Sequence, residues 1–369
     1  MSITPPHLTP QQSGPPRRDA PVVAVWLFAV AGMILIMIAL GGATRLTGSG
    51  LSIMEWAPLM GALPPWSEAE WQRLFGLYQK IPQYELVNHG FGLDGFKQIF
   101  WLEWAHRLWG RLIGLAFAVP LVWFWATGRI SRALRPRLAV LFLLGGLQGG
   151  VGWFMVASGF LPDRTSVSPY RLVIHLTLAL VLYSAIVWTG LMVLHPWRDK
   201  GRKRSALDHL ALISAVLVGL TIVAGGFVAG LHAGLDYNTF PLMDGALVPA
   251  GYADLHPFVQ NLAENVAAVQ FNHRLLATLT LVCVTTTVAV GWRGPCGTAL
   301  SRALIAAGCA VALQYALGIA TLLLVVPIGL ATLHQAGAVV LLTTQLLLLH
   351  VLRRAACGQM RQDAPCSIH

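Results

Sequence analysis

Long apolar runs separated by short polar segments extend along nearly the whole chain. Each run holds about 20 residues, the length that an α-helix needs to cross the hydrocarbon core of a bilayer. This pattern predicts an all-α polytopic membrane protein with eight transmembrane helices. The predicted spans are residues 22–42, 101–126, 138–158, 171–194, 207–230, 269–291, 302–324 and 328–352.

The last four predicted spans repeat features of the first four. The first span ends in Gly41-Gly42, followed by Gly50-Leu51, and the fifth ends in Gly225-Gly226, followed by Gly234-Leu235 at the same spacing. Two further matches occur in the same order. Residues 58–63 match 241–247, and Leu147-Gln148 with Gly152 match Leu313-Gln314 with Gly318. Four spans per unit, an even number, keep both copies in one orientation. We therefore expect two duplicated four-helix bundles in parallel orientation, related by an axis along the membrane normal.

The repeat divides the chain into five regions. An N-terminal four-helix bundle is expected at 22–196 and a C-terminal one at 207–352, joined by a linker at 197–206. Residues 1–21 are rich in Pro, Gln and Ser and lack an apolar core, so we expect a disordered N-terminus, and 353–369 form a tail. Four glycines of the third span are expected to let this helix approach its neighbours closely: Gly145, Gly146, Gly149 and Gly150.

Composition and charge fit a bacterial plasma (inner) membrane protein. Hydrophobic residues make up 56% of the 369 positions and charged residues only 11%, less than half the charge of ordinary soluble domains. The net charge of +10 does not indicate a nucleic-acid partner, because most Lys and Arg lie in the termini and in every second segment between spans. These segments share one side of the membrane, and the positive-inside rule assigns that side to the cytoplasm. Both termini are therefore expected in the cytoplasm, with the long segments 43–100 and 231–268 outside.

Four histidines at repeated positions are the candidate metal ligands. His106, His175, His273 and His334 each lie within a turn or two of the outer end of an even-numbered span. Two imidazoles from facing helices at one depth form the arrangement that binds haem iron axially. Zinc or copper would need more ligands than two His per half. A lone buried histidine is more often bonded to a backbone carbonyl, but four at duplicated positions favour haem.

One residue of the repeated His-Arg motif differs between the halves. Glu103 lies three residues before His106, whereas Gln270 lies three residues before His273. A carboxylate one turn from a haem ligand, in a poorly hydrated place, suits proton transfer, so Glu103 is the candidate catalytic residue. The alternative is that Glu103 only pairs with Arg107, four residues on. The glutamine in the second copy favours a catalytic role over a purely structural pair.

Three arginines are candidates for binding haem propionates. Arg107 and Arg274 each follow a candidate ligand, and Arg45 lies at the outer end of the first span, where the charge rule disfavours arginine. A guanidinium binds a carboxylate bidentately. The alternative is that each side chain only snorkels to the membrane interface. Propionate binding is favoured for Arg45 and Arg107, and the two alternatives are evenly balanced for Arg274.

Several other signals carry less weight. His89, His232 and His256 lie in or beside outer segments, where a solvated loop role outweighs an entrance role. None of the five cysteines lies in an outer segment or forms a CxxC motif, which argues against a disulfide framework or an iron–sulfur site.

The chain resembles haem A synthase. The resemblance rests on residues 41–52, on Phe96–Trp101 leading into the motif at Glu103–Arg107, and on 332–335, and it covers nearly the whole chain after residue 22. It implies two four-helix bundles that oxidise a methyl group of haem o, through a hydroxymethyl intermediate, to the formyl group of haem a for terminal oxidase assembly. Some members have a cysteine pair in the first outer loop; this chain has none, which is typical of the proteobacterial and mitochondrial branch.

The resemblance also implies a division of labour between the halves. His273 and His334 would ligate a resident haem b, while His106 and His175 would hold the substrate haem beside Glu103. Molecular oxygen or water would supply the oxygen atom. Electrons would come from an external donor, by resemblance a ferredoxin-type reductant, because no nicotinamide, flavin or iron–sulfur motif is visible. Haem o synthase is a further partner implied by resemblance, and a homo-oligomer remains open.

Two functions from other classes remain as alternatives. A di-haem b membrane electron carrier, for example the anchor of a quinol dehydrogenase, would use two histidine pairs, but it would treat both sites alike. A haem or small-molecule transporter more often has inverted repeats and broken helices near the midplane. The Glu103–Gln270 difference favours the enzyme over the carrier.

Overall fold

The computed structural model describes residues 20–58, 60–197, 204–294 and 297–362, and these parts are almost entirely helical. Eight helices are long and apolar enough to cross a membrane, so the predicted number and type of elements are confirmed. They are α1 (Ala20–Leu46), α4 (Leu93–Ala126), α5 (Arg135–Val156), α6 (Pro169–Leu194), α7 (Ala206–Gly230), α8 (Val266–Trp292), α9 (Thr298–Leu323) and α10 (Ile328–Gln362).

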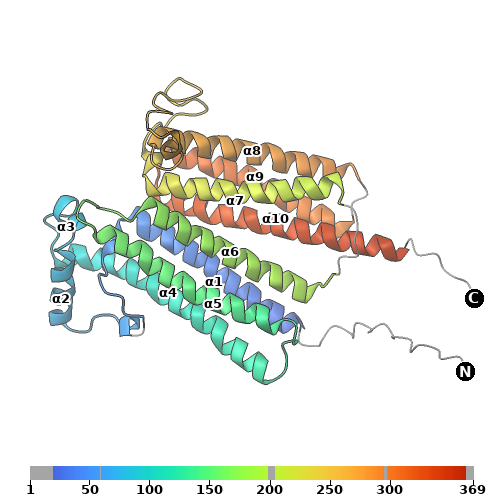
Figure 1. The fold of residues 1–369 in the computed structure, drawn as a ribbon, viewed down its shortest axis with the longest axis horizontal. Helices are drawn as coiled ribbons and strands as arrows, with labels where there is room; N and C mark the ends of the chain where they lie inside the picture. Colours follow the sequence, from blue (N-terminus) through green and yellow to red (C-terminus); the bar gives the residue numbers. More distant parts are fainter. Residues whose placement is uncertain (1–19, 59, 198–203, 295–296, 363–369) are drawn as a thin grey trace, which may run out of the picture.

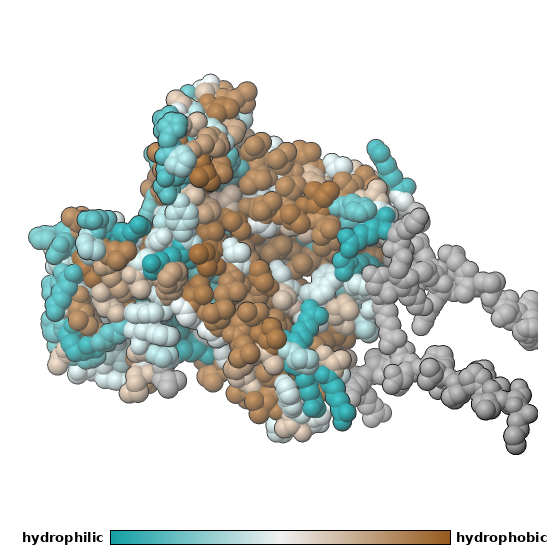
Figure 2. Space-filling view, in the orientation of Figure 1, coloured by the Kyte–Doolittle hydropathy of each residue, from teal (hydrophilic) through white to brown (hydrophobic). Residues whose placement is uncertain are grey.

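The helices lie in two groups of four that run side by side (Figure 1). One group holds α1, α4, α5 and α6, and the other holds α7 to α10; they meet where α1 contacts α10 and α6 contacts both α7 and α10. The beginning of α1 and the end of α10 lie at the same end of the molecule, and α2 and α3 lie at the opposite end. Their cytoplasmic placement stays a prediction. Apolar side chains cover the sides of the bundle between two more polar ends (Figure 2), which is the surface that lipid requires.

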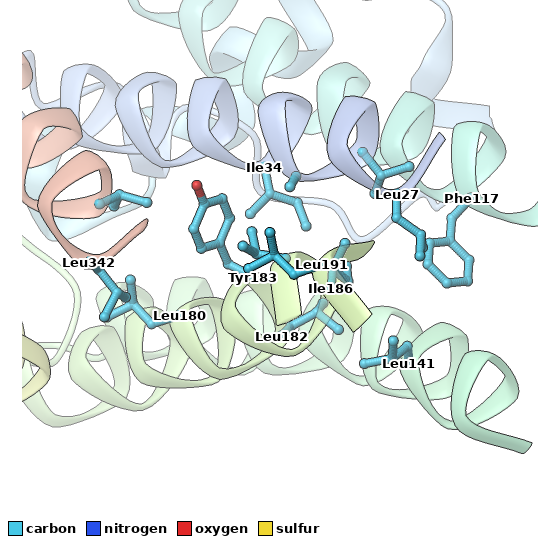
Figure 3. Packing of buried hydrophobic residues seen from close by; sticks show 14 of the residues in the cluster. Leu27, Ile34, Phe117, Leu141, Leu180, Leu182, Tyr183, Ile186, Leu191 and Leu342 are labelled. Carbon is cyan, nitrogen blue, oxygen red and sulfur yellow. The ribbon is translucent and has the colours of Figure 1, made fainter. Parts of the chain in front are cut away.

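One apolar core is shared by both groups. Leu27 and Ile34 of α1 and Tyr183 of α6 pack in the same cluster as Leu342 of α10 (Figure 3). The hydroxyl groups of Tyr183 and Thr343 are 2.7 Å apart across this contact. Since a lipid environment gives helices no hydrophobic reason to associate, close packing and such interhelical hydrogen bonds hold the two groups together.

Two short helices in the first outer segment were not predicted. They are α2 (Glu68–Tyr78) and α3 (Pro82–Leu86). The hydroxyl of Ser67 accepts a hydrogen bond from the backbone N–H of Glu70 at 3.2 Å, an N-cap that the Ser-x-x-Glu spacing could have indicated. The buried rings of α2 pack on the outer part of α4, and together they form a small cluster: Trp71, Phe75, Tyr78, Phe96 and Phe100.

Some predicted boundaries differ from the observed ones. The second predicted span begins at 101, but its helix α4 begins at Leu93. Phe96 and Phe100 in the first two turns of α4 belong to the cluster with α2, and this packing extends the helix. The last helix continues past the predicted boundary at 352 to Gln362. Most of the predicted disordered N-terminus and of the linker lies outside the described residues, whereas residues 353–362 of the predicted tail continue α10.

The expectation for the four glycines of α5 is wrong. A Cβ atom built on Gly145, Gly146, Gly149 or Gly150 would meet no other atom within 4 Å. Only Leu138 and Leu141 of this helix are buried. These glycines therefore do not mediate close packing in the described part of the chain; they leave open space beside α5.

Candidate haem sites and the contacts that orient them

Each of the four candidate histidines lies against a glycine of a neighbouring helix. A Cβ atom on the glycine would come within 2.9 to 3.1 Å of an imidazole atom in every case, which is tighter than most real Cβ contacts. The pairs are Gly41–His106, Gly152–His175, Gly225–His273 and Gly318–His334. These are the glycines that align the two halves in the sequence, so they keep room for four rings at matching positions.

The imidazoles of His273 and His334 face each other in the second half. Their ring centroids are 6.5 Å apart and the ring planes are nearly perpendicular, at 87°. Metal–imidazole bonds are about 2 Å long, so this separation leaves room for one metal ion bound by both rings. Among the described residues no cluster of three or more His, Cys, Asp or Glu side chains could hold a metal ion. A metal held here would need its remaining ligands from a cofactor, which fits the in-plane nitrogens of a haem.

Contacts to Nδ1 orient three of the four rings. His273 Nδ1 lies 3.1 Å from the carbonyl oxygen of Thr221. Gln314 Nε2 lies 3.0 Å from Nδ1 of His334 and donates to the carbonyl oxygen of the same residue at 2.9 Å. Gln148 makes the matching contacts to His175, at 3.1 and 3.0 Å. An acceptor for the free ring N–H fixes the orientation of a metal-binding imidazole, and the Thr221 carbonyl can serve as one for His273. At His334 and His175 the glutamine amide nitrogen faces Nδ1, and the side-chain oxygen of each glutamine has no partner among the described residues. The Leu-Gln repeat was noticed in the sequence, but its role beside the histidines was missed.

The first half holds its rings less tightly. Within the described ranges no ring contact like that of His273 and His334 joins His106 and His175, and no hydrogen bond orients His106. A Cβ atom on Gly41 would lie 3.1 Å from Nε2 of His106, so this glycine leaves room for the His106 ring. The two halves therefore place their histidines alike but differ in how closely the pair is held.

Glu103 is buried and fully hydrogen-bonded. The residue is 2% exposed, and Oε2 accepts hydrogen bonds from the Ser52 hydroxyl at 2.7 Å and from the Ile53 N–H at 2.9 Å. Oε1 pairs with Arg107 at 2.6 Å, and the same guanidinium donates to the carbonyl oxygens of Ile53 and Glu55. The pair considered as an alternative in the sequence is therefore present, and it fastens the loop after α1 to α4.

Gln270 and Arg274 fasten the loop after α7 in the same way. The Gln270 amide donates to the carbonyl oxygens of Ala233 and Asp236, both at 2.6 Å. Arg274 donates to the Gln270 side-chain oxygen at 2.9 Å and to the Tyr237 carbonyl. Glu103 faces two donors where Gln270 faces two acceptors, so local hydrogen bonding supplies a structural reason for the difference. The catalytic role of Glu103 stays a prediction.

Arg45 and Arg274 each have a buried donor without a hydrogen-bond partner among the described residues: Nη2 in Arg45 and Nε in Arg274. Arg45 lies one turn beyond Gly41, the neighbour of His106, on the outer side. Burial, and then the positive charge of Arg45, lower the pKa of His232 in the loop after α7. Of the other outer histidines, His89 contacts the Tyr84 ring.

Comparisons with known proteins give the family. Residues 24–346 match the model of the COX15-CtaA family of cytochrome oxidase assembly proteins. The chain is 59% identical to the haem A synthase of Granulibacter bethesdensis over 363 residues, which covers 98% of this chain and 94% of the relative. The chain belongs to the haem A synthase family. It is also 50% identical to the haem A synthases of Rhodospirillum centenum and Parvibaculum lavamentivorans, over 92% and 86% of this chain and 91% and 90% of those relatives.

Membership in the haem A synthase family gives the glutamine contacts a testable role. We expect Gln314→Leu to loosen the ring of His334 and to weaken haem retention about 10–100-fold, the usual effect of losing a partner of a metal ligand. Haem content per protein after purification in detergent measures this effect. Gln345→Leu is the control, because Gln345 lies on α10 but contacts no candidate histidine. Equal haem loss in both variants would contradict the role of Gln314.

Proposed function

We propose that the protein is a haem A synthase that oxidises a methyl substituent of haem o, through a hydroxymethyl stage, to the formyl group of haem a for terminal oxidase assembly. The observation that carries this conclusion is the identity of 59% to a haem A synthase over nearly the full length of both chains. The four histidines against glycines, in two pairs, support it.

The two histidine pairs are proposed to have different tasks. His273 and His334 would hold a resident haem b, since their rings already face each other at a suitable separation. When bound, that group would supply one-electron redox chemistry. His106 and His175 would bind the substrate haem, and the looser arrangement of that pair suits a molecule that must enter and leave. Glu103 is proposed to hold or move a proton beside the substrate.

The arginines are proposed to bind propionate groups. The unused donor of Arg45 supports a contact with the substrate haem, because a buried guanidinium N–H without a partner is costly. Arg107 and Arg274 both donate to loop carbonyls; Arg274 also has a buried Nε donor without a partner among the described residues, which supports a propionate contact there as well. We further propose an inner-membrane location with both termini in the cytoplasm. Electrons would come from an external, ferredoxin-type donor, oxygen or water would supply the oxygen atom, and haem o synthase would deliver the substrate.

Extraction of haems from membranes that contain the protein tests this function. With haem o supplied, cells that express the wild-type chain should accumulate the hydroxylated haem or haem a, which chromatography and mass spectrometry distinguish. Membranes from cells without the protein are the control. Recovery of haem o alone, with the protein present and folded, would rule out the enzyme and leave the electron carrier.

A further inference from the structure

We propose that a gap between α4 and α5, on the lipid-facing edge of the first half, receives the isoprenoid tail of the substrate haem. The inference rests on the proposed function and adds where the tail of that substrate lies. Helices α4 and α5 form the edge of the first half that is remote from α7 to α10 (Figure 1). Helices α8 and α9 hold the matching position in the second half.

Two ring contacts hold α4 and α5 together at either side of the gap. Toward the cytoplasmic end, Phe117 stacks on Phe142 with centroids 6.1 Å apart. Toward the outer end, the Arg107 guanidinium lies 5.8 Å from the ring centroid of Trp153. The two contacts define one antiparallel register, in which α4 residues 108–116 face α5 residues 143–152.

The helix faces between these contacts carry glycines. Gly114 lies one turn from Phe117 on α4, and Gly145 and Gly149 follow Phe142 at helical spacing on α5. A Cβ atom at any of the three would meet no other atom within 4 Å. Glycine is unfavourable inside a helix relative to alanine, and here no close approach of another helix accounts for it. The two helices thus leave an open space where their faces would otherwise touch.

The second half fills the same positions with side chains. Aligning Glu103 with Gln270, and Gln148 with Gln314, places Leu281, Val311 and Tyr315 where Gly114, Gly145 and Gly149 stand. Val311 is 2% exposed in the core, and Leu281 packs against that core. The Tyr315 hydroxyl lies 3.0 Å from that of Thr278 on α8, and its ring contacts Phe240 of the loop. The half proposed to keep its haem is therefore closed at this point.

The gap leads directly to the substrate site. Gly145, Gly149 and Gly152 share one face of α5, at spacings of four and three residues, and Gly152 lies against His175. Gly152 has a counterpart in Gly318, whereas Gly145 and Gly149 are glycine in the first half only. From His175 the gap runs about 10 Å along α5 toward the cytoplasmic side, at 1.5 Å per residue.

A loop covers the outer end of the gap and leaves the rest open. Trp56 stacks on Trp153, with ring centroids 6.0 Å apart, and Arg111 donates to the carbonyl oxygens of Ala57 and Pro58, both at 2.8 Å. In the second half the loop residue Phe240 instead contacts Tyr315, which lies one turn deeper. The uncovered part of the gap therefore opens sideways toward lipid, lined by glycine and apolar residues.

These features fit an apolar chain attached to a ring that is bound beside His175. The glycines and apolar side chains between the two ring contacts offer a polar ligand few donors or acceptors; at the outer end, Arg111 donates to the loop carbonyls through Nε and Nη2, and its buried Nη1 has no partner among the described residues. Lipid is as apolar as the gap, so the tail gains little energy by entering it. The gap matters because the tail must lie somewhere while the ring is bound, and a filled gap would create a clash.

Filling the gap tests this proposal. Gly149→Leu and Gly145→Leu add side chains where a Cβ meets nothing within 4 Å, and Gly219→Leu on α7, equally open, is the matched control. Each purified protein, already holding its resident haem b, is titrated with haem o and with haem b, which lacks the tail. We expect both gap variants to weaken haem o binding by about tenfold or more, a penalty typical of overpacking. Haem b binding at the same site should not change, and Gly219→Leu should match the wild type.

Two outcomes would overturn the proposal. Unchanged haem o binding in both gap variants would show that the tail lies elsewhere. Loss of a co-purifying lipid from these variants would not alter that conclusion. Equal weakening of haem o and haem b would show that the gap accommodates the ring. Because binding is measured without turnover, a wild-type protein that binds haem o but never converts it would refute the proposed function and leave this inference intact.

Discussion

A His273→Ala variant is expected to lose its resident haem b while keeping its helices. An axial ligand should matter more than an outer partner of a ligand, whose loss alone costs about 10–100-fold in metal affinity. We therefore expect haem b content to fall by at least that factor. The fold should persist, because alanine is a good helix former and the Thr221 carbonyl that contacts His273 lies within α7.

The b-type absorption spectrum of the purified variant measures this loss, with circular dichroism as the check on helix content. His256→Ala is the matched control, since this histidine lies in the outer loop between α7 and α8 and does not belong to either candidate pair. His106→Ala should also keep the resident haem. An unchanged spectrum in His273→Ala would remove this residue from the ligand set, and loss of the signal in His106→Ala would exchange the roles of the halves.

The transmembrane architecture could be predicted because lipid imposes one rule on every spanning helix. Eight apolar runs became eight helices, and the histidines at repeated positions lie at equivalent glycines. Boundaries were less predictable where the helix leaves the bilayer. The start of α4 at Leu93 is set by packing of Phe96 and Phe100 on α2, a contact between segments far apart in the sequence.

The contacts around Glu103 could not be predicted from the repeat alone. At one aligned position the first half has a carboxylate and the second half has an amide. The sequence alone favours a catalytic role for the carboxylate as the reason for this difference. The structure adds that Glu103 meets the donors Ser52 and Ile53, whereas Gln270 meets carbonyl acceptors. Similarly, the glycines of α5 were expected to draw helices together, but only Gly152 lies against a neighbouring side chain. In both cases the partner came from another helix or loop, which spacing along one segment does not reveal.

The sharpest test of the active half is a Glu103→Gln variant. We expect it to keep its haems and to lose conversion of haem o by at least about 100-fold, the lower range of general acid–base contributions. The amide keeps the size of the side chain, but its single oxygen can replace only one of the two carboxylate oxygens, so its NH2 group would face either the Arg107 guanidinium or the Ser52 and Ile53 donors. The amide cannot take up a proton at the pH of the cell, so proton transfer should be lost together with one of these contacts. Haem a formed per protein in membranes measures the effect.

Ser52→Ala separates this role from the fastening of the loop. That substitution removes the hydroxyl that donates to Oε2 at 2.7 Å but leaves the carboxylate in place. If Glu103 moves a proton, Ser52→Ala should retain most conversion while Glu103→Gln retains almost none. If Glu103 only holds the loop, both variants weaken the same contact, so they should lower conversion and thermal stability together. Normal conversion in Glu103→Gln would remove the carboxylate from the chemistry and leave the loop contacts as its whole contribution.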